Sequence, residues 1–111
     1  MENEDALAAL SALAQETRLA IFRLLVEAGA EGRAVGSIGE ALGLPSATLS
    51  FHLKELKNAG LVAVRRESRS LIYSASFATM NDLIGFLTRN CCGGDMTACD
   101  LTEIRAPRET T

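Results

Sequence analysis

The chain of 111 residues has little of what enzymes, membrane proteins and secreted proteins require. It has a single histidine, no glycine-rich phosphate loop and no carboxylate pair beside its cysteines, so we do not expect an enzyme. No apolar run approaches the ~18–20 residues of a membrane span. The acidic residues 1–5 lack the basic and apolar regions of a secretory signal. We therefore expect a cytoplasmic protein with no membrane partner.

Cysteine is scarce and unevenly placed. The three cysteines, Cys91, Cys92 and Cys99, lie within nine positions of one another. An odd, clustered set is a poor disulfide framework in a chain expected to be cytosolic. It indicates reactive or metal-binding thiols instead.

The formal net charge of −3 argues, taken alone, against a nucleic-acid partner. The distribution of charge points the other way, because residues 54–69 carry a net charge of +3 and the rest of the chain −6. The basic residues of that segment are Lys54, Lys57, Arg65, Arg66 and Arg69. A basic strip on an acidic body is compatible with a protein that reads DNA.

Hydrophobic residues make up 48% of the chain, which allows one domain with a real core. The apolar periodicity predicts a mostly helical fold with one β-hairpin. The expected helices cover residues 5–14, 16–28, 35–42, 46–59 and 77–90, the expected strands 61–66 and 71–75, and a polar loop 30–34. This order, α-α-α-α-β-β-α, is that of a winged helix-turn-helix.

Two apolar stripes are predicted outside the helix-turn-helix. In the first helix the stripe consists of Leu7, Leu10 and Leu13, and in the last helix of Met80, Leu83, Ile84 and Leu87. A domain of this size has limited core in which to bury the second stripe, which favours a homodimer. Packing of the stripe within one subunit is the alternative.

The helix expected at 46–59 follows a short helix and the break Gly43-Leu44-Pro45. This is the order of a helix-turn-helix, whose second helix enters the major groove. Hydroxyl groups near its start suit bases and phosphates, and the basic hairpin suits a wing that grips phosphate or the minor groove. The alternative is that these polar residues form only a solvated surface and bind no DNA. The candidate DNA-binding residues are Ser46, Ala47, Thr48, Ser50, His52, Lys54, Lys57, Arg65, Arg66 and Arg69. For His52, on the shoulder of the apolar side, a packed hydrogen-bonding residue is the simpler interpretation and a base contact the alternative.

The stretch SATLSFHLKELKNAGLV, residues 46–62, resembles the recognition-helix signature of the ArsR/SmtB family of arsenic repressors. Residues 65–69 look like the wing of that family, where glycine commonly stands in place of Ser68, and residues 16–25 resemble its second helix. The resemblance covers most of residues 10–90. It implies a homodimeric transcriptional repressor, paired through its first and last helices, that reads an imperfect palindrome in double-stranded operator DNA.

One departure from the family pattern is informative. Many arsenic-sensing relatives carry a Cys-x-Cys pair in the third helix, and residues 35–42 hold no cysteine. A sensor site of that kind cannot exist in this chain.

The run Asn90-Cys91-Cys92-Gly93-Gly94, followed by Cys99, resembles the C-terminal thiol site of a subgroup of arsenite-responsive repressors. Trivalent arsenic is soft and makes three pyramidal bonds to sulfur, so three thiolates satisfy it. The glycines allow the chain to fold back and deliver Cys99. The resemblance implies release of DNA when these thiols bind arsenite, antimonite or methylarsenite, without an organic cofactor. Residues 1–90 would then form the DNA-binding and dimerisation domain and 91–111 a flexible sensor tail.

Several other roles for the cysteines stay open. They could bind another soft metal, or zinc with Asp95 or Asp100 as a fourth ligand. They could form a redox switch in which one of the adjacent pair joins Cys99 on oxidation. They could also be idle. A metal-buffering or chaperone protein is conceivable from the tail, but it leaves the winged-helix body unexplained.

Overall fold

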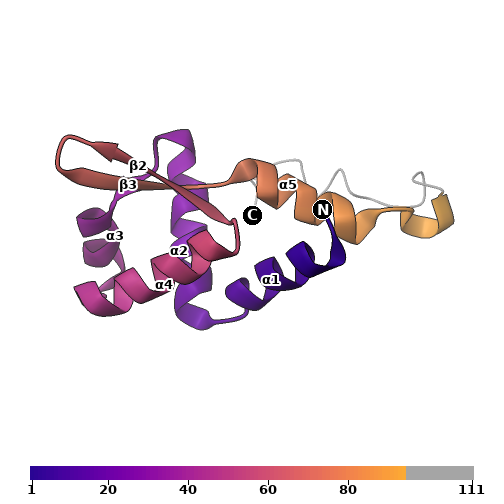
Figure 1. Cartoon of the computed structure of the whole chain (residues 1–111), viewed down its shortest axis with the longest axis horizontal. Helices are drawn as coiled ribbons and strands as arrows, with labels where there is room; N and C mark the ends of the chain where they lie inside the picture. Colours follow the sequence, from indigo (N-terminus) through magenta and orange to yellow (C-terminus); the bar gives the residue numbers. More distant parts are fainter. Residues whose placement is uncertain (95–111) are drawn as a thin grey trace, which may run out of the picture.

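The computed structural model describes residues 1–94, which form several helices and a small sheet (Figure 1). The elements are α1 (Asn3–Leu13), α2 (Glu16–Ala28), the 3-10 helix η1 (Gly29–Glu31), β1 (Arg33–Ala34), α3 (Val35–Leu42), α4 (Ser46–Asn58), β2 (Val62–Glu67), β3 (Ser70–Ala75), α5 (Phe77–Thr88) and η2 (Cys91–Gly94). The expected helical fold with a β-hairpin wing is confirmed. No helix of the described part is both long and apolar enough to cross a membrane.

The loop expected at residues 30–34 is wrong for its last two residues. Arg33 and Ala34 form β1, which pairs antiparallel with β3 and gives a three-stranded sheet of order β1-β3-β2. A strand of two residues has no alternating pattern to detect, and it forms because the open edge of β3 offers unpaired backbone groups. Gly32 permits the approach, since a side chain there would collide with the Tyr73 carbonyl oxygen.

The wing is a hairpin of β2 and β3 that runs in register from Val62 opposite Ala75 to Glu67 opposite Ser70. Only Ser68 and Arg69 connect the strands, because β2 runs to Glu67 and β3 starts at Ser70, beyond the expected 61–66 and 71–75, and the turn is tight. Ser68 adopts a φ of +56°, in the left-handed region. A positive φ at the first of two turn residues favours glycine, so Ser68 occupies a position better suited to glycine.

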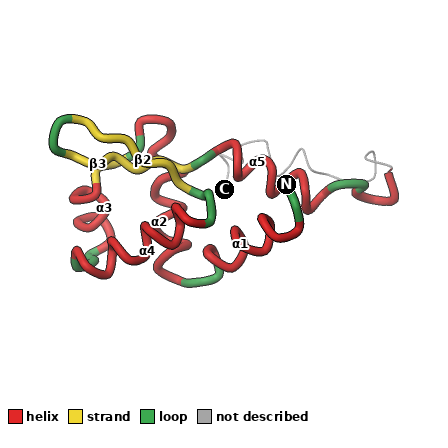
Figure 2. The backbone as a smooth tube through the Cα atoms, viewed as in Figure 1, coloured by secondary structure: helices red, strands yellow, loops and turns green. Residues whose placement is uncertain are grey.

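The core lies between the five α-helices and the base of the hairpin, whose arrangement Figure 2 shows. The apolar side of α4 lies in this core, where Leu49, Leu53 and Leu56 are buried. The largest fully buried side chains on the neighbouring elements are Ile21, Leu25, Ile38 and Leu61. Packing of α4 through three leucines fixes which of its faces remains exposed.

The predicted apolar stripe of α1 lies mainly at the surface and not in the core. Ala6, Ala9 and Ala12 face the core, whereas Leu7 and Leu10 are 59% and 40% exposed. Small alanine side chains allow α1 to lie close to its neighbours, and this turns the leucines on the other side of the helix outwards. The sequence pattern alone cannot distinguish these faces, because both are apolar.

The apolar stripe of α5 is divided between the core and the surface. Leu83 is buried and Met80 half-buried, but Ile84 and Leu87 are 42% and 59% exposed. Helices α1 and α5 contact each other and lie together, on the side away from the tip of the hairpin (Figure 1). We call the exposed apolar residues of these two helices, Leu7, Leu10, Ile84 and Leu87, the α1/α5 surface.

Candidate nucleic-acid interface and cysteine pair

The turn between α3 and α4 fixes the start of the candidate recognition helix. Gly43 ends α3 in the left-handed conformation, with a φ of +65°, and Pro45 occupies the N-cap position of α4. The Leu44 N–H donates to the Gly39 carbonyl oxygen at 3.0 Å, which closes the turn. This geometry and the buried leucines together leave one polar face of α4 uncovered.

That face carries most of the predicted DNA-binding residues of α4. Its exposed members are Ser46, Ala47, Thr48, Ser50, Lys54 and Lys57, together with Phe51. Phe51 was not among the predicted site residues, although its phenyl ring is 56% exposed in the middle of this face. The signal in the sequence was a large aromatic residue outside the Leu49, Leu53, Leu56 stripe.

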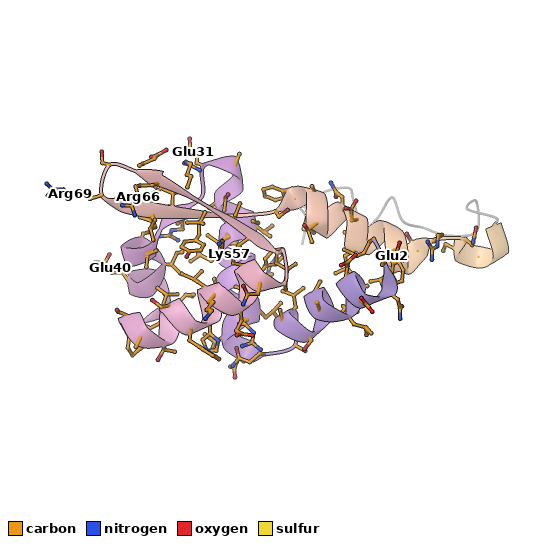
Figure 3. All side chains as sticks on the ribbon, viewed as in Figure 1. Glu2, Glu31, Glu40, Lys57, Arg66 and Arg69 are labelled. Carbon is orange, nitrogen blue, oxygen red and sulfur yellow. The ribbon has the colours of Figure 1, made fainter. Side chains whose placement is uncertain are left out.

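The hairpin positions its three arginines differently. Arg66 and Arg69 are exposed and pair with no carboxylate among residues 1–94, and Figure 3 shows Arg69 extending from the hairpin tip. The Arg65 guanidinium instead forms an ion pair with Glu67, Nε to Oε2 at 2.8 Å, and donates to the Glu31 carbonyl oxygen at 2.9 Å. Arg65 thus ties the wing to η1, while Arg66 and Arg69 face solvent.

A groove of about 480 Å³ separates α4 from the hairpin. Lys54 and Lys57 line it from α4 and Arg69 from the wing, and none of the described residues that line it is acidic. Its remaining lining residues are Ala34, Val35, Gly36, Ser50, Leu53, Ser70, Leu71 and Tyr73. Three cations without a carboxylate around one groove create a positive potential that attracts phosphate.

His52 lies at the edge of the exposed face and is half-buried. The Arg18 Nη1–H of α2 donates to His52 Nδ1 at 3.2 Å, and the Arg18 Nε–H donates to the Ala12 carbonyl oxygen of α1 at 2.8 Å. The imidazole also meets the Phe51 ring edge-on, with centroids 5.2 Å apart. His52 therefore has protein partners, and no sequence pattern predicts its contact with Arg18.

Two of the three predicted thiols lie together directly after α5. The Sγ atoms of Cys91 and Cys92 are 3.3 Å apart, well beyond the ~2.05 Å of a disulfide bond. The left-handed φ values of Asn90 and Cys92, both +59°, turn the chain sharply here. Cys92 is exposed and Cys91 half-buried. Cys99 lies outside the described residues, so the predicted third ligand has no described position.

The cysteine pair is remote from the wing. Figure 1 shows η2 beyond the end of α5, at the opposite end of the described chain from the β2–β3 turn. Within residues 1–94, no group of three or more His, Cys, Asp or Glu side chains is arranged to hold a metal ion. A ligand bound at Cys91 and Cys92 therefore cannot touch the recognition helix directly.

Comparison with known proteins places the fold among transcriptional regulators. A family described as a helix-turn-helix domain matches residues 13–65. YceK of Bacillus subtilis, an uncharacterized HTH-type transcriptional regulator, is 40% identical over 77 residues, 68% of this chain and 76% of YceK. The transcriptional activator HlyU of Vibrio cholerae is 34% identical over 83 residues, 75% of this chain and 74% of HlyU.

Solved structures extend the similarity to the three-dimensional fold. An ArsR-like transcriptional regulator from Rhodococcus sp. RHA1 has a TM-score of 0.72 at 25% identity, over 91% of this chain and 92% of that protein. The homodimeric winged helix-turn-helix DNA-binding domain of Mb0332 from Mycobacterium bovis, a possible ArsR-family regulator, has a TM-score of 0.64 at 29% identity. The match to Mb0332 covers 78% of this chain and 81% of that domain.

Proposed function

Because the chain belongs to the ArsR/SmtB family of winged helix-turn-helix transcriptional regulators, we propose that it is a repressor that releases operator DNA when its cysteines capture trivalent arsenic. The chain is a DNA-binding regulator and not an enzyme. Repression, the homodimer and the inducer belong to the proposal. The observation that carries it is the Cys91–Cys92 sulfur pair, 3.3 Å apart at the end of α5.

The groove and the wing support binding to double-stranded DNA. The hydroxyl-bearing start of α4 enters the major groove, and Lys54, Lys57 and Arg69 hold the phosphates beside it. Arg66 adds a further cation on the hairpin. Such contacts replace condensed counterions, so affinity falls steeply as salt is raised.

The α1/α5 surface supports a homodimer. Leu7 and Leu87 are each 59% exposed, which is a poor arrangement in water for large aliphatic side chains. A two-fold axis would bring the same surface of a second copy against it, as in other isologous dimers. The similar domain of Mb0332 is described as homodimeric. Two recognition helices related by that axis would read the two halves of a palindrome.

The donor chemistry of the cysteine pair fits arsenic. Two adjacent thiolates supply two of the three sulfur bonds that trivalent arsenic takes, and Cys99 would supply the third. Arsenite, antimonite and methylarsenite share this preference for sulfur. The thiols must lose their protons on binding, so capture releases protons. The proposed site of action is the cytoplasm, where thiols are kept reduced.

The separation between the cysteines and α4 determines how release must work. Cys91 follows α5, which carries Ile84 and Leu87 of the α1/α5 surface. A ligand that pulls the chain together after α5 would shift that helix at the dimer interface and change the spacing of the recognition helices. It drives release only if it binds the DNA-free arrangement more tightly than the DNA-bound one.

The test is fluorescence anisotropy of the reduced protein on DNA from its own upstream region, with arsenite, zinc and peroxide titrated separately. Release by arsenite alone supports the proposal. Release by zinc or peroxide alone assigns the sensor to another metal or to thiol oxidation. Cys92→Ser and Cys99→Ser should each abolish the arsenite response, whereas Asn90→Gly, which keeps all three thiols and suits the positive φ, should retain it.

A further inference from the structure

The least expected residue of the recognition face is Phe51. Its ring is 56% exposed, and its neighbours one turn away on that face are Ala47 and Lys54. The apolar side of α4, with its three buried leucines, is fully used in the core, so Phe51 contributes nothing there. The ring is therefore placed where the proposed DNA duplex docks.

We propose that Phe51 reads the 5-methyl group of a thymine in the operator, and that Arg18 is the positioning residue that holds the supporting His52 ring. This inference rests on the proposed binding of operator DNA and adds a specificity determinant to it. A phenyl ring has no hydrogen-bond donor or acceptor, so it cannot read the polar edges of bases. The thymine methyl is the apolar group exposed in the major groove, and phenylalanine is among the residues that contact it.

The contact between Arg18 and His52 sets the hydrogen-bonding role of one imidazole nitrogen. A guanidinium group only donates hydrogen bonds, so His52 Nδ1, 3.2 Å from Arg18 Nη1, must accept. Arg18 is itself held by its bond to the Ala12 carbonyl oxygen and by the bond from its backbone N–H to Gln15 Oε1 at 2.8 Å.

The held imidazole in turn supports Phe51. The two rings meet at an interplanar angle of 66°, the edge-to-face geometry favoured between ring systems. A side chain that already rests on a fixed neighbour loses less conformational freedom when it binds. The arrangement Arg18–His52–Phe51 thus extends from α2 to the exposed face of α4 and presents the phenyl ring in one orientation.

The experiment compares two duplexes of the upstream region, one made with thymine and one with uracil in its place, which differ only in the 5-methyl groups. For the wild type we expect weaker binding to the uracil duplex, by about four-fold for each methyl group contacted and about 15-fold for a dimer with two such contacts. In Phe51→Ala the ratio of the two dissociation constants should fall towards one, and Phe51→Leu should give an intermediate ratio.

Two further variants separate the parts of the proposal. Leu19→Ala removes an exposed aliphatic side chain outside α4 and should keep the wild-type ratio. Arg18→Lys keeps the charge but loses the fixed geometry of the guanidinium, and it should lower the ratio while the melting temperature stays within a few degrees of wild type. Equal weakening of Arg18→Lys on both duplexes would show that Arg18 only stabilises the fold, and would overturn its positioning role.

The outcomes also separate this inference from the proposed function. A ratio of dissociation constants near one for the wild type, or the same ratio for Phe51→Ala as for the wild type, would overturn the reading of thymine by Phe51. Neither result would contradict the proposed binding of DNA. Absence of salt-dependent binding to either duplex would instead remove the proposed operator binding itself. Single thymine-to-uracil replacements along the bound region then locate the methyl group, because only that position should lose its effect in Phe51→Ala.

Discussion

Replacement of Arg69 by alanine should weaken the salt dependence of DNA binding. It should leave the free energy of unfolding almost unchanged. The side chain is exposed on the wing, lines the groove opposite Lys54 and Lys57, and pairs with no carboxylate of the described residues. Its loss therefore costs the free protein little. In the complex it removes one phosphate contact from each subunit and two from a dimer.

The size of the effect follows from counterion release. The logarithm of the binding constant falls with the logarithm of salt concentration by about 0.9 for each phosphate neutralised on duplex DNA. Two lost contacts should make the slope shallower by about 1.8. Between about 50 and 200 mM salt, the loss of affinity of Arg69→Ala relative to wild type should shrink by about 12-fold.

Fluorescence anisotropy over a series of salt concentrations measures this slope. Arg23→Ala is the matched control, because Arg23 is an exposed cation of α2 paired with Glu27 at 3.5 Å and does not line the groove. Arg65→Ala is a second comparison. The Arg65 guanidinium is bonded to Glu67 and to the Glu31 carbonyl oxygen, so its loss should mainly destabilise the wing. A slope for Arg69→Ala equal to that of wild type, or an equal change in Arg23→Ala, would refute the assignment of the groove to phosphate.

Four other predictions follow from the fold and the cysteine pair. Ser68→Gly should raise the free energy of unfolding by about 0.5–1 kcal/mol in urea titrations, because Ser68 has a positive φ. Ala9→Leu should lower it by about 1–3 kcal/mol, because Ala9 is 0% exposed against the core and a larger side chain has no room. Leu87→Asp should shift the proposed dimer towards monomer in sedimentation equilibrium with little change in helix content, since Leu87 is 59% exposed. Cys92→Ser should bind DNA with wild-type affinity in the absence of arsenite, measured by anisotropy, because η2 lies far from the wing (Figure 1).

Periodicity predicted the helices of this chain well, because each has apolar positions at helical spacing and a clear end. The predicted ranges 16–28 and 35–42 match α2 and α3 to the residue. Orientation was less predictable. In α1 the alanine face and the leucine face are both apolar, and only the close packing of the helix decides that the alanines turn inwards.

The candidate interface was predictable as a surface but not in its contacts. The exposed face of α4 follows from the buried positions of Leu49, Leu53 and Leu56, since residues three and four apart share a face. The partners of Arg65 and His52 could not be predicted. Glu31 and Arg18 lie 34 residues away from them in sequence, and only the folded chain brings them together. A strand as short as β1 leaves no pattern at all.

The distance between η2 and the wing has a consequence for how such a protein can change over evolutionary time. The side chains that line the groove come from α3, α4 and the sheet, whereas Cys91 and Cys92 lie beyond the end of α5, at the other end of the described chain. If the proposed sensor is correct, substitutions after α5 can alter the chemistry of the inducer without disturbing the recognition of the operator. The same DNA-reading body can serve a succession of chemical signals, each acquired by a few changes at one end of the molecule.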